Sequence, residues 1–284
     1  MSAADQVGDL DPQASQRDLD LQLALELADV ADAITMSRFR ASDLVVQTKP
    51  DMTPVSEADQ ATERALRERL SDLRPGDAIV GEEYGAEHAD GEQVTRRWIV
   101  DPIDGTKGYV RGMPVWATLL ALEEDGELVV GMASAPALGR RWWAARDHGA
   151  YTSFEGATER QPIRVSGVRS LQDAQLSFGG FEEWREAGRL QQLLSLGEHV
   201  WRVRGYGDFW QYMLVAEGVA EIATDPAVSL WDLAAPLVIV REAGGRFTDF
   251  TGAVTASAGS GLATNGHLHE AARAFFAAPT AGKE

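Results

Sequence analysis

The sequence predicts an α/β fold with two unlike halves, an α+β N-terminal half and an α/β C-terminal half. Two apolar stripes with helical spacing open the chain, at 18–40 and 56–73, and a hairpin signal follows at Asp125-Gly126. Strand and helix patterns then alternate over 174–250. At 284 residues, the chain can form one large domain or two packed halves.

Two helices are expected at the start of the chain. Residues 1–17 are polar, lack the features of a signal peptide and predict a disordered leader. The apolar stripe of the first helix, 18–40, comprises Leu23, Leu27, Val30 and Ile34. Ser56 is the expected N-cap of the second helix, which runs to about Leu73 and carries Asp59 in its first turn.

An antiparallel sheet is expected next. Residues 78–85, A-I-V-G-E-E-Y-G, predict a short strand that ends in paired acids. An acidic surface loop at 86–95 leads to a second apolar strand, W-I-V-D, at 98–101. The hairpin and its continuation complete this sheet, with strands at Val115–Leu122, Glu127–Ala135 and Arg140–Ala145.

A cluster of glycine and proline at 150–165 predicts the boundary between the halves, which we place at 18–155 and 156–284. Alternating patterns make the C-terminal half an α/β unit. Its expected strands are 174–178, 199–203, 220–224 and 246–250, and its expected helices are 184–195, 208–217 and 231–243.

Composition excludes several functional classes. The formal net charge of −18 argues against nucleic acid as a partner, because binding a duplex needs a basic footprint. The absence of cysteine excludes disulfides, thiol nucleophiles and cysteine-ligated zinc, and fits a reducing compartment. We find no apolar run of about 18 residues that could span a membrane, so we expect a cytoplasmic protein with no membrane partner.

Asp101 and Asp104 stand three residues apart in W-I-V-D-P-I-D-G at 98–105. Pro102 and Gly105 exclude a simple helical continuation, so both carboxylates are expected on a turn at a strand end. Two close carboxylates repel each other unless a cation lies between them. With oxygen ligands and no cysteine, that cation is expected to be Mg²⁺ or Mn²⁺. Taken alone, the two aspartates could also be ordinary turn formers.

Two further acidic segments accompany this pair. Glu82 and Glu83 close the upstream strand, and Asp232 stands at the expected start of an apolar helix. Paired acids at a strand end are often only solvated, which is the alternative for Glu83. Three acidic strand or helix ends in this order nevertheless form a specific signal for a metal site.

These segments resemble the inositol monophosphatase superfamily of metal-dependent phosphatases. The resemblance covers roughly residues 18–275 and includes T-P-V-S-E-A-D at 53–59, G-E-E, W-I-V-D-P-I-D-G-T, W-D-L-A-A and R-E-A-G-G. The segments that resemble its bacterial histidinol-phosphatase branch are K-G-Y-V-R-G-M-P-V-W at 107–116, S-A-P-A-L-G-R-R-W-W-A-A-R at 134–146 and W-R-V-R-G-Y-G-D-F at 201–209. The resemblance implies a layered αβαβα sandwich, a site between the halves and a homodimer.

Position by position, the resemblance implies a site for two or three Mg²⁺ ions. Glu82, Asp101 and the backbone carbonyl of Ile103 would hold one ion. Asp101, Asp104 and Asp232 would hold a second. A third, weaker ion would lie near Glu82.

The resemblance also implies catalytic roles. Thr106 would pair with Asp59 to orient and deprotonate the attacking water, with Glu83 in support. A hydroxyl has no useful pKa near 7, so Thr106 makes chemical sense as a relay to Asp59. The backbone N–H groups of Gly105 and Thr106 would cradle the phosphate. The alternative for Asp59 is a first-turn acid favoured only by the helix dipole.

Lys49, Arg204, Asp208 and Asp225 are the expected substrate contacts. Lys49 resembles a family lysine near the third metal and the phosphate, although a loop lysine can also be simply solvated. Asp208 could instead cap the helix that follows it, and Asp225 could serve a strand-end turn. Acids at these two positions would suit a substrate tail with an ammonium and an imidazole.

We therefore expect a Mg²⁺-dependent phosphate monoester hydrolase that acts on L-histidinol phosphate by direct attack of water. The alternative substrates are inositol 1-phosphate and sugar or nucleotide phosphates. A hypothesis from another class is a catalytically silent family member that serves as a scaffold or regulatory subunit.

Overall fold

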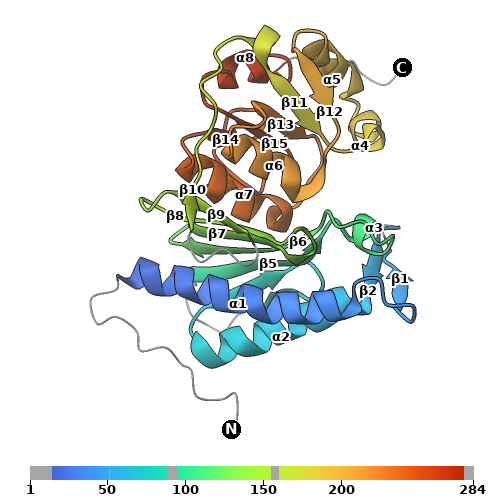
Figure 1. The fold of residues 1–284 in the computed structure, drawn as a ribbon, viewed down its shortest axis with the longest axis vertical. Coiled ribbons are helices and arrows are strands. Elements are labelled where there is room, and N and C mark those ends of the chain that lie inside the picture. The colour runs from blue at the N-terminus through green and yellow to red at the C-terminus, as the bar shows by residue number, and fades with distance from the viewer. Residues whose placement is uncertain (1–14, 51, 88–94, 155–159, 278–284) are drawn as a thin grey trace.

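The described residues, 15–50, 52–87, 95–154 and 160–277, form five alternating layers of helices and sheets in the computed structural model (Figure 1). Two long helices cover the outer face of a first sheet, and two helices lie between that sheet and a second one. Shorter helices cover the far face of the second sheet. The predicted αβαβα sandwich is confirmed.

The first sheet has eight strands in the order β10-β9-β8-β7-β6-β5-β3-β4. All neighbouring strands are antiparallel except β3 and β5, which are parallel. Its strands are β3 (Ala78–Gly81), β4 (Gly85–Glu87), β5 (Arg96–Asp104), β6 (Ala117–Glu124), β7 (Glu127–Ala135), β8 (Arg140–Ala145), β9 (Ala150–Phe154) and β10 (Gln161–Pro162). A separate two-stranded ribbon is formed by β1 (Val46–Thr48) and β2 (Pro54–Ser56).

Two long helices, α1 (Gln16–Arg38) and α2 (Glu57–Leu73), pack on the first sheet through Leu23, Leu27 and Leu66. A capping box starts each helix, with Ser15 and Ser56 as the N-caps. The predicted cap at Ser56 is confirmed. The predicted leader lies mainly outside the described residues, as does most of the predicted acidic loop at 86–95.

The second sheet has five strands in the order β12-β11-β13-β15-β14, with parallel pairing only around β11. Its strands are β11 (Gln175–Phe178), β12 (Arg202–Arg204), β13 (Ile222–Asp225), β14 (Arg246–Thr248) and β15 (Gly261–Thr264). The remaining helices are α3 (Thr106–Tyr109), α4 (Phe181–Glu186), α5 (Leu190–Gly197), α6 (Asp208–Ala216), α7 (Leu230–Glu242) and α8 (His269–Arg273).

The layer between the sheets consists of α6 and α7, and it joins the two halves through a shared core. Leu119 and Trp142 of the first sheet, Met213 of α6, Leu233 of α7 and Phe247 of the second sheet belong to one buried cluster. Because burial of each such side chain stabilises the fold by roughly 1.5–3 kcal/mol, the halves are held together by their packing. The shared core therefore fixes the positions of residues from the two halves relative to one another.

In the C-terminal half, two predicted elements needed correction and one strand was missed. The single helix expected at 184–195 is two helices, α4 and α5, because Gly188 adopts a φ of +68° between them. The strand expected at 199–203 is β12, three residues further along at its start. The strand β15 was not predicted, because its G-L-A-T segment is too short to show a period.

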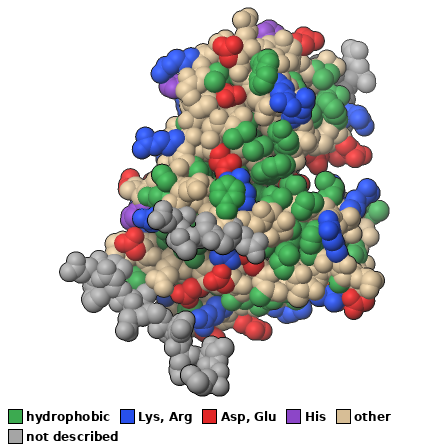
Figure 2. All heavy atoms as spheres, viewed as in Figure 1, with side chains coloured by type: hydrophobic (Ala, Val, Ile, Leu, Met, Phe, Trp, Pro, Cys, Tyr) green, Lys and Arg blue, Asp and Glu red, His purple; other side chains and the backbone are tan. Residues whose placement is uncertain are grey.

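On the face shown in Figure 2, acidic and basic side chains are interspersed over both halves, and apolar side chains gather where the halves meet. Within the described ranges, no helix combines the length and the apolar composition needed to cross a bilayer.

Candidate active site

The segment that carries the first two aspartates is a bulged end of β5, not the turn that Pro102 predicts. The register of β5 against β6 shifts between Asp101 and Asp104. A bulge bends the strand and re-aims its side chains, which brings these two carboxylates to one point. Gly105 then adopts a φ of +86°, a conformation that favours glycine, and the chain enters α3.

Three carboxylates converge at the junction of the two halves. One ligand atom from each of Asp101, Asp104 and Asp232 lies within 4.8 Å of the others. The Phe209 N–H donates to Asp104 Oδ2 at 2.5 Å, and the Ser229 N–H donates to Asp232 Oδ2 at 2.7 Å. Two carboxylates of the cluster are thus oriented by backbone groups at the starts of α6 and α7.

This cluster holds more negative charge than the protein around it compensates. Burial, together with the charges of neighbouring carboxylates, raises the pKa of Asp101 and of Asp104 well above the usual range. Burial also raises the pKa of Asp232 to about 7, although the Ser229 N–H opposes the shift. Such an arrangement requires either protons or a bound cation.

Glu82 and Glu83 follow β3 and share a single lysine. Lys49 Nζ lies 2.7 Å from Glu82 Oε1 and 2.6 Å from Glu83 Oε1. Burial lowers the pKa of Lys49, but the hydrogen bonds to both glutamates outweigh it and raise that pKa. Burial raises the pKa of Glu83 to about 7, and the bond to Lys49 opposes the rise.

The residues present fit a divalent metal. Four carboxylates, from Glu82, Asp101, Asp104 and Asp232, converge from both halves, and every donor is an oxygen. Oxygen ligands of this kind suit hard cations. The excess negative charge seen in the raised pKa values is what such ions would neutralise.

Thr106 and Asp59 lie next to this cluster and form a potential proton relay. Thr106 Oγ1 is 3.1 Å from Asp59 Oδ1 and 2.9 Å from the Ile103 carbonyl oxygen, so its one proton has two acceptors. Asp59 is fully buried, and its other oxygen accepts from the Ser56 N–H at 2.8 Å. Burial raises the pKa of Asp59, which makes it a better proton acceptor than an ordinary aspartate.

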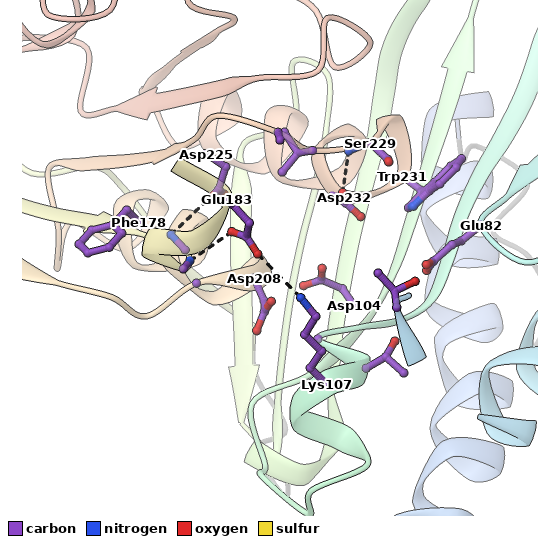
Figure 3. Close-up of a pocket in the computed structure, with 18 of the residues that line it drawn as sticks. Glu82, Asp104, Lys107, Phe178, Glu183, Asp208, Asp225, Ser229, Trp231 and Asp232 are labelled. Atoms are coloured by element: carbon purple, nitrogen blue, oxygen red, sulfur yellow. Dashed lines mark hydrogen bonds and ion pairs between the residues drawn. The ribbon is translucent and has the colours of Figure 1, made fainter. Parts of the chain in front are cut away.

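A cavity of about 720 Å³ opens from the carboxylate cluster between the two halves (Figure 3). Glu82, Asp104 and Asp232 lie at one side of this cavity. Gly105 and Thr106, the predicted phosphate-binding residues, also line it. The cavity is therefore large enough for a small organic phosphate whose phosphoryl group faces the carboxylates.

Three further acids, Glu183, Asp208 and Asp225, line the opposite side of the cavity. Asp225 is buried and accepts from the Gly179 N–H at 3.1 Å and from the Tyr212 hydroxyl at 2.6 Å. Burial raises its pKa to about 7. We call Glu183, Asp208 and Asp225 the tail acids.

The other two tail acids are more open to solvent. Asp208 starts α6 with a φ of +47°. Loss of surrounding water between the two halves, with the charge of Glu183, raises the pKa of Asp208 to about 6. Glu183 Oε2 accepts from the Gly180 N–H at 3.2 Å, and its Oε1 lies 4.0 Å from Lys107 Nζ. Lys107 thus reaches across the cavity from α3 toward the tail acids (Figure 3).

Comparison with known proteins agrees with this geometry. The profile described as "Inositol monophosphatase family" matches residues 17–278. This chain belongs to the inositol monophosphatase family. It is 53% identical to a histidinol-phosphatase of Streptomyces coelicolor, over 88% of this chain and 94% of that protein. A histidinol-phosphatase of Mycobacterium tuberculosis is also 53% identical, over 88% of this chain and 95% of that protein.

Solved structures of the family share the fold. The extragenic suppressor protein suhB from Bartonella henselae is 27% identical, with a TM-score of 0.81, and the match covers 91% of this chain and 98% of that one. An inositol monophosphatase from Zymomonas mobilis is 30% identical, with a TM-score of 0.79 over 93% and 99% of the two chains. The family is metal-dependent, and its members here indicate that this chain is a phosphoric monoester hydrolase.

The structure brings most of the residues expected from the family motifs to the cavity or directly behind it. Asp101, Ile103, Asp59 and Glu83 lie behind the lining residues: Asp101 is part of the carboxylate cluster, and Asp59 and the Ile103 carbonyl accept from the Thr106 hydroxyl. Arg204 is different: its exposed guanidinium donates to the Val203 carbonyl oxygen at 2.7 Å and does not line the cavity.

Two charged cavity residues, Glu183 and Lys107, were not singled out in the sequence. Glu183 is the third residue of α4, where an acid is common because the helix start favours negative charge. Lys107 follows the D-G-T motif and is mostly exposed. Neither carries a local signal that separates a cavity residue from a surface one.

Proposed function

We propose that this chain hydrolyses L-histidinol phosphate to L-histidinol and phosphate, with Mg²⁺ as its metal. The tail acids carry this proposal. A cavity that offers Glu183, Asp208 and Asp225 opposite the metal carboxylates suits a substrate whose alcohol part is cationic. L-histidinol phosphate has an ammonium and a protonatable imidazole, whereas inositol is a neutral polyol. The 53% identity to two histidinol-phosphatases supports the same substrate.

The metal would be held by the carboxylates of Glu82, Asp101, Asp104 and Asp232, with the Ile103 carbonyl as a further ligand. When bound, divalent cations neutralise the charge of a phosphate dianion and make a water molecule more acidic. The protein orients two of these ligands before any ion binds, through the backbone N–H groups of Phe209 and Ser229.

The proton of the attacking water would pass through Thr106 to Asp59. The Thr106 hydroxyl can donate to Asp59 Oδ1, at 3.1 Å, and accept from water with its lone pairs. The raised pKa of Asp59 favours receipt of this proton. The backbone N–H groups at the start of α3 would hold phosphate oxygens, and the tail acids would orient the alcohol.

The experiment that tests the substrate is phosphate release from L-histidinol phosphate, inositol 1-phosphate, fructose 1,6-bisphosphate and 3′-phosphoadenosine 5′-phosphate. Each is assayed with Mg²⁺, with Mn²⁺ and with EDTA. We expect about a 100-fold preference in kcat/KM for L-histidinol phosphate, which is ~2.7 kcal/mol of discrimination. Equal or better hydrolysis of inositol 1-phosphate would overturn the substrate assignment. No release from any substrate with metal present would favour the silent scaffold.

Two finer expectations, a homodimer and a cytoplasmic location, stay predictions. Light scattering of the purified chain tests the first, because a dimer of a 30.8 kDa chain differs twofold in mass from a monomer. Fractionation of cells that express the full chain tests the second.

A further inference from the structure

A fully buried carboxylate, Glu63, lies outside the cavity and has no role in the scheme above. It is on α2 one turn after Asp59, so both side chains project from the same face of the helix. Glu63 Oε2 accepts from the Glu83 N–H at 2.7 Å, and Oε1 accepts from the Tyr84 N–H at 3.2 Å. Arg67 Nε donates to Oε1 at 2.8 Å. Burying an acid is costly unless its oxygens are paired, and these are paired with the Arg67 guanidinium and with two N–H groups of the turn after β3.

The backbone is held on both sides of Glu82, on one side by β5 and on the other by Glu63. The Glu82 N–H donates to the Val100 carbonyl oxygen on β5 at 3.2 Å. The peptide that follows Glu82 carries the Glu83 N–H, which is the group bound by Glu63. The Cα atom of Glu82 therefore lies between two anchored peptides. The side chain of Glu82 points into the cavity, toward the carboxylate cluster.

The adjacent glycine shows how closely this carboxylate approaches the strand. A Cβ atom at Gly81 would lie 2.0 Å from Glu63 Oε1, which is far inside contact distance. The backbone of Gly81 has no positive φ, so the constraint is the space that Glu63 occupies and not the conformation. The end of β3 is thus built around this one side chain.

We infer that Glu63 is a positioning residue for the metal site, which acts by fixing the turn that presents Glu82. The helix α2 then orients two functional groups of the site. It carries Asp59, the proton acceptor of the relay, and through Glu63 it positions Glu82, a proposed metal ligand. The inference rests on the proposed metal-dependent function, but not on the identity of the substrate.

The test is Glu63→Gln, which keeps size and shape. An amide offers one acceptor oxygen and one donor nitrogen, so one side of the new amide must face a backbone N–H group with an N–H of its own. We expect the Mg²⁺ dissociation constant, measured by calorimetry on the whole chain, to rise about tenfold or more, as is typical when a partner of a metal ligand is lost. The Mg²⁺ concentration for half-maximal activity should rise by a similar factor, and kcat at saturating Mg²⁺ should fall much less.

Glu221→Gln is the matched control. Glu221 is also a buried carboxylate that accepts from a backbone N–H, that of Gln175 at 2.6 Å, but it lies directly before β13, in the C-terminal half. This variant should lose thermal stability without any change in Mg²⁺ affinity. If both variants weaken Mg²⁺ binding equally, or if Glu63→Gln lowers only the melting temperature, the inference is wrong.

Gly81→Ala provides a second route in case Glu63→Gln fails to fold. The added methyl group displaces the Glu63 carboxylate and leaves its chemistry unchanged. It should also weaken Mg²⁺ binding by about tenfold, and unaltered binding would count against the inference. Because calorimetry needs no substrate, failure of the substrate assignment would appear separately, as metal binding without hydrolysis of L-histidinol phosphate.

Discussion

The two halves of the protein build the cavity in different ways. The N-terminal half contributes residues close together in the sequence, on the bulged end of β5, the start of α3 and the turn after β3. The C-terminal half contributes Glu183, Asp208 and Asp232, all from the first turns of helices, together with Asp225 at the end of β13. In the proposed function, the N-terminal half therefore provides most of the metal ligands and the proton relay, and the C-terminal half contacts the alcohol part of the substrate.

The largest effect should come from the cluster that both halves share. Asp101→Asn removes a carboxylate from the centre of the metal site and should reduce turnover below detection, because Asp101 is the most enclosed of the three converging aspartates. Phosphate release and Mg²⁺ calorimetry measure this. The melting temperature in EDTA should not fall, since the substitution relieves repulsion between carboxylates. Activity within tenfold of wild type would contradict the assignment of the metal ligands.

The second prediction concerns a residue of the N-terminal half whose loss should slow proton transfer without weakening metal binding. Thr106→Ala should lower kcat by about 100-fold, the scale of a lost proton-transfer partner. Mg²⁺ affinity should change much less, because the carboxylate that accepts from the Thr106 hydroxyl, Asp59, is not a proposed metal ligand and the metal-binding carboxylates keep their contacts. Thr106→Ser keeps the hydroxyl and should retain most of the activity. An unchanged kcat in the alanine variant would refute the relay.

The tail acids provide the third comparison. Glu183→Gln keeps an acceptor for the Gly180 N–H but removes the charge. It should lower kcat/KM for L-histidinol phosphate by about tenfold or more, since one charged hydrogen bond contributes about 1.5–3 kcal/mol. Hydrolysis of glycerol 2-phosphate, which has a neutral tail, should not change. Arg204→Ala is the control, because this side chain lies outside the cavity, and a larger loss there than at Glu183 would reverse our view of the substrate site.

The smallest effect concerns stability without metal. Folding raises the pKa of Asp101, Asp104 and Asp232, the last to about 7, so the folded state binds more protons than the unfolded chain between pH ~4 and ~7. The free energy of unfolding therefore decreases as pH rises through that window. In EDTA, we expect the melting temperature to be a few degrees lower at pH 8 than at pH 5.5.

Added Mg²⁺ should raise the melting temperature at pH 8 to near its value at pH 5.5. The bound ion would neutralise the carboxylate charges that protons neutralise at pH 5.5. The net charge of −18 also destabilises the protein at higher pH, so Asp232→Asn serves to isolate the cluster. Its melting temperature in EDTA should depend less on pH than that of wild type. Equal pH dependence in the two proteins would exclude the cluster as the cause.

Much of the fold could be predicted because its signals are local. The stripe of α1, the N-cap of α2 and the turn between β6 and β7 depend on residues a few positions apart. The four-residue strand β15 is too short to show a local pattern, whereas the helix break at Gly188 has a local signal, a glycine with positive φ, that the helical stripe around it obscured. Arg204 illustrates the same limit, since a position beside a motif does not say which way a side chain points.

The sequence alone determined the order of the acidic motifs and the residue types that a metal-dependent phosphatase needs. These properties follow from neighbouring residues: a proline and a glycine after a strand, or a serine before a helix. The family motifs already implied that Thr106 meets Asp59, 47 positions away, whereas only the tertiary structure decided that Asp104 meets the Phe209 N–H, 105 positions away. It also decided the roles of Glu63 and Glu183. The physical reason is that both are acids near helix starts or on helix faces, which acquire a specific role only from the backbone and charges that folding brings to them.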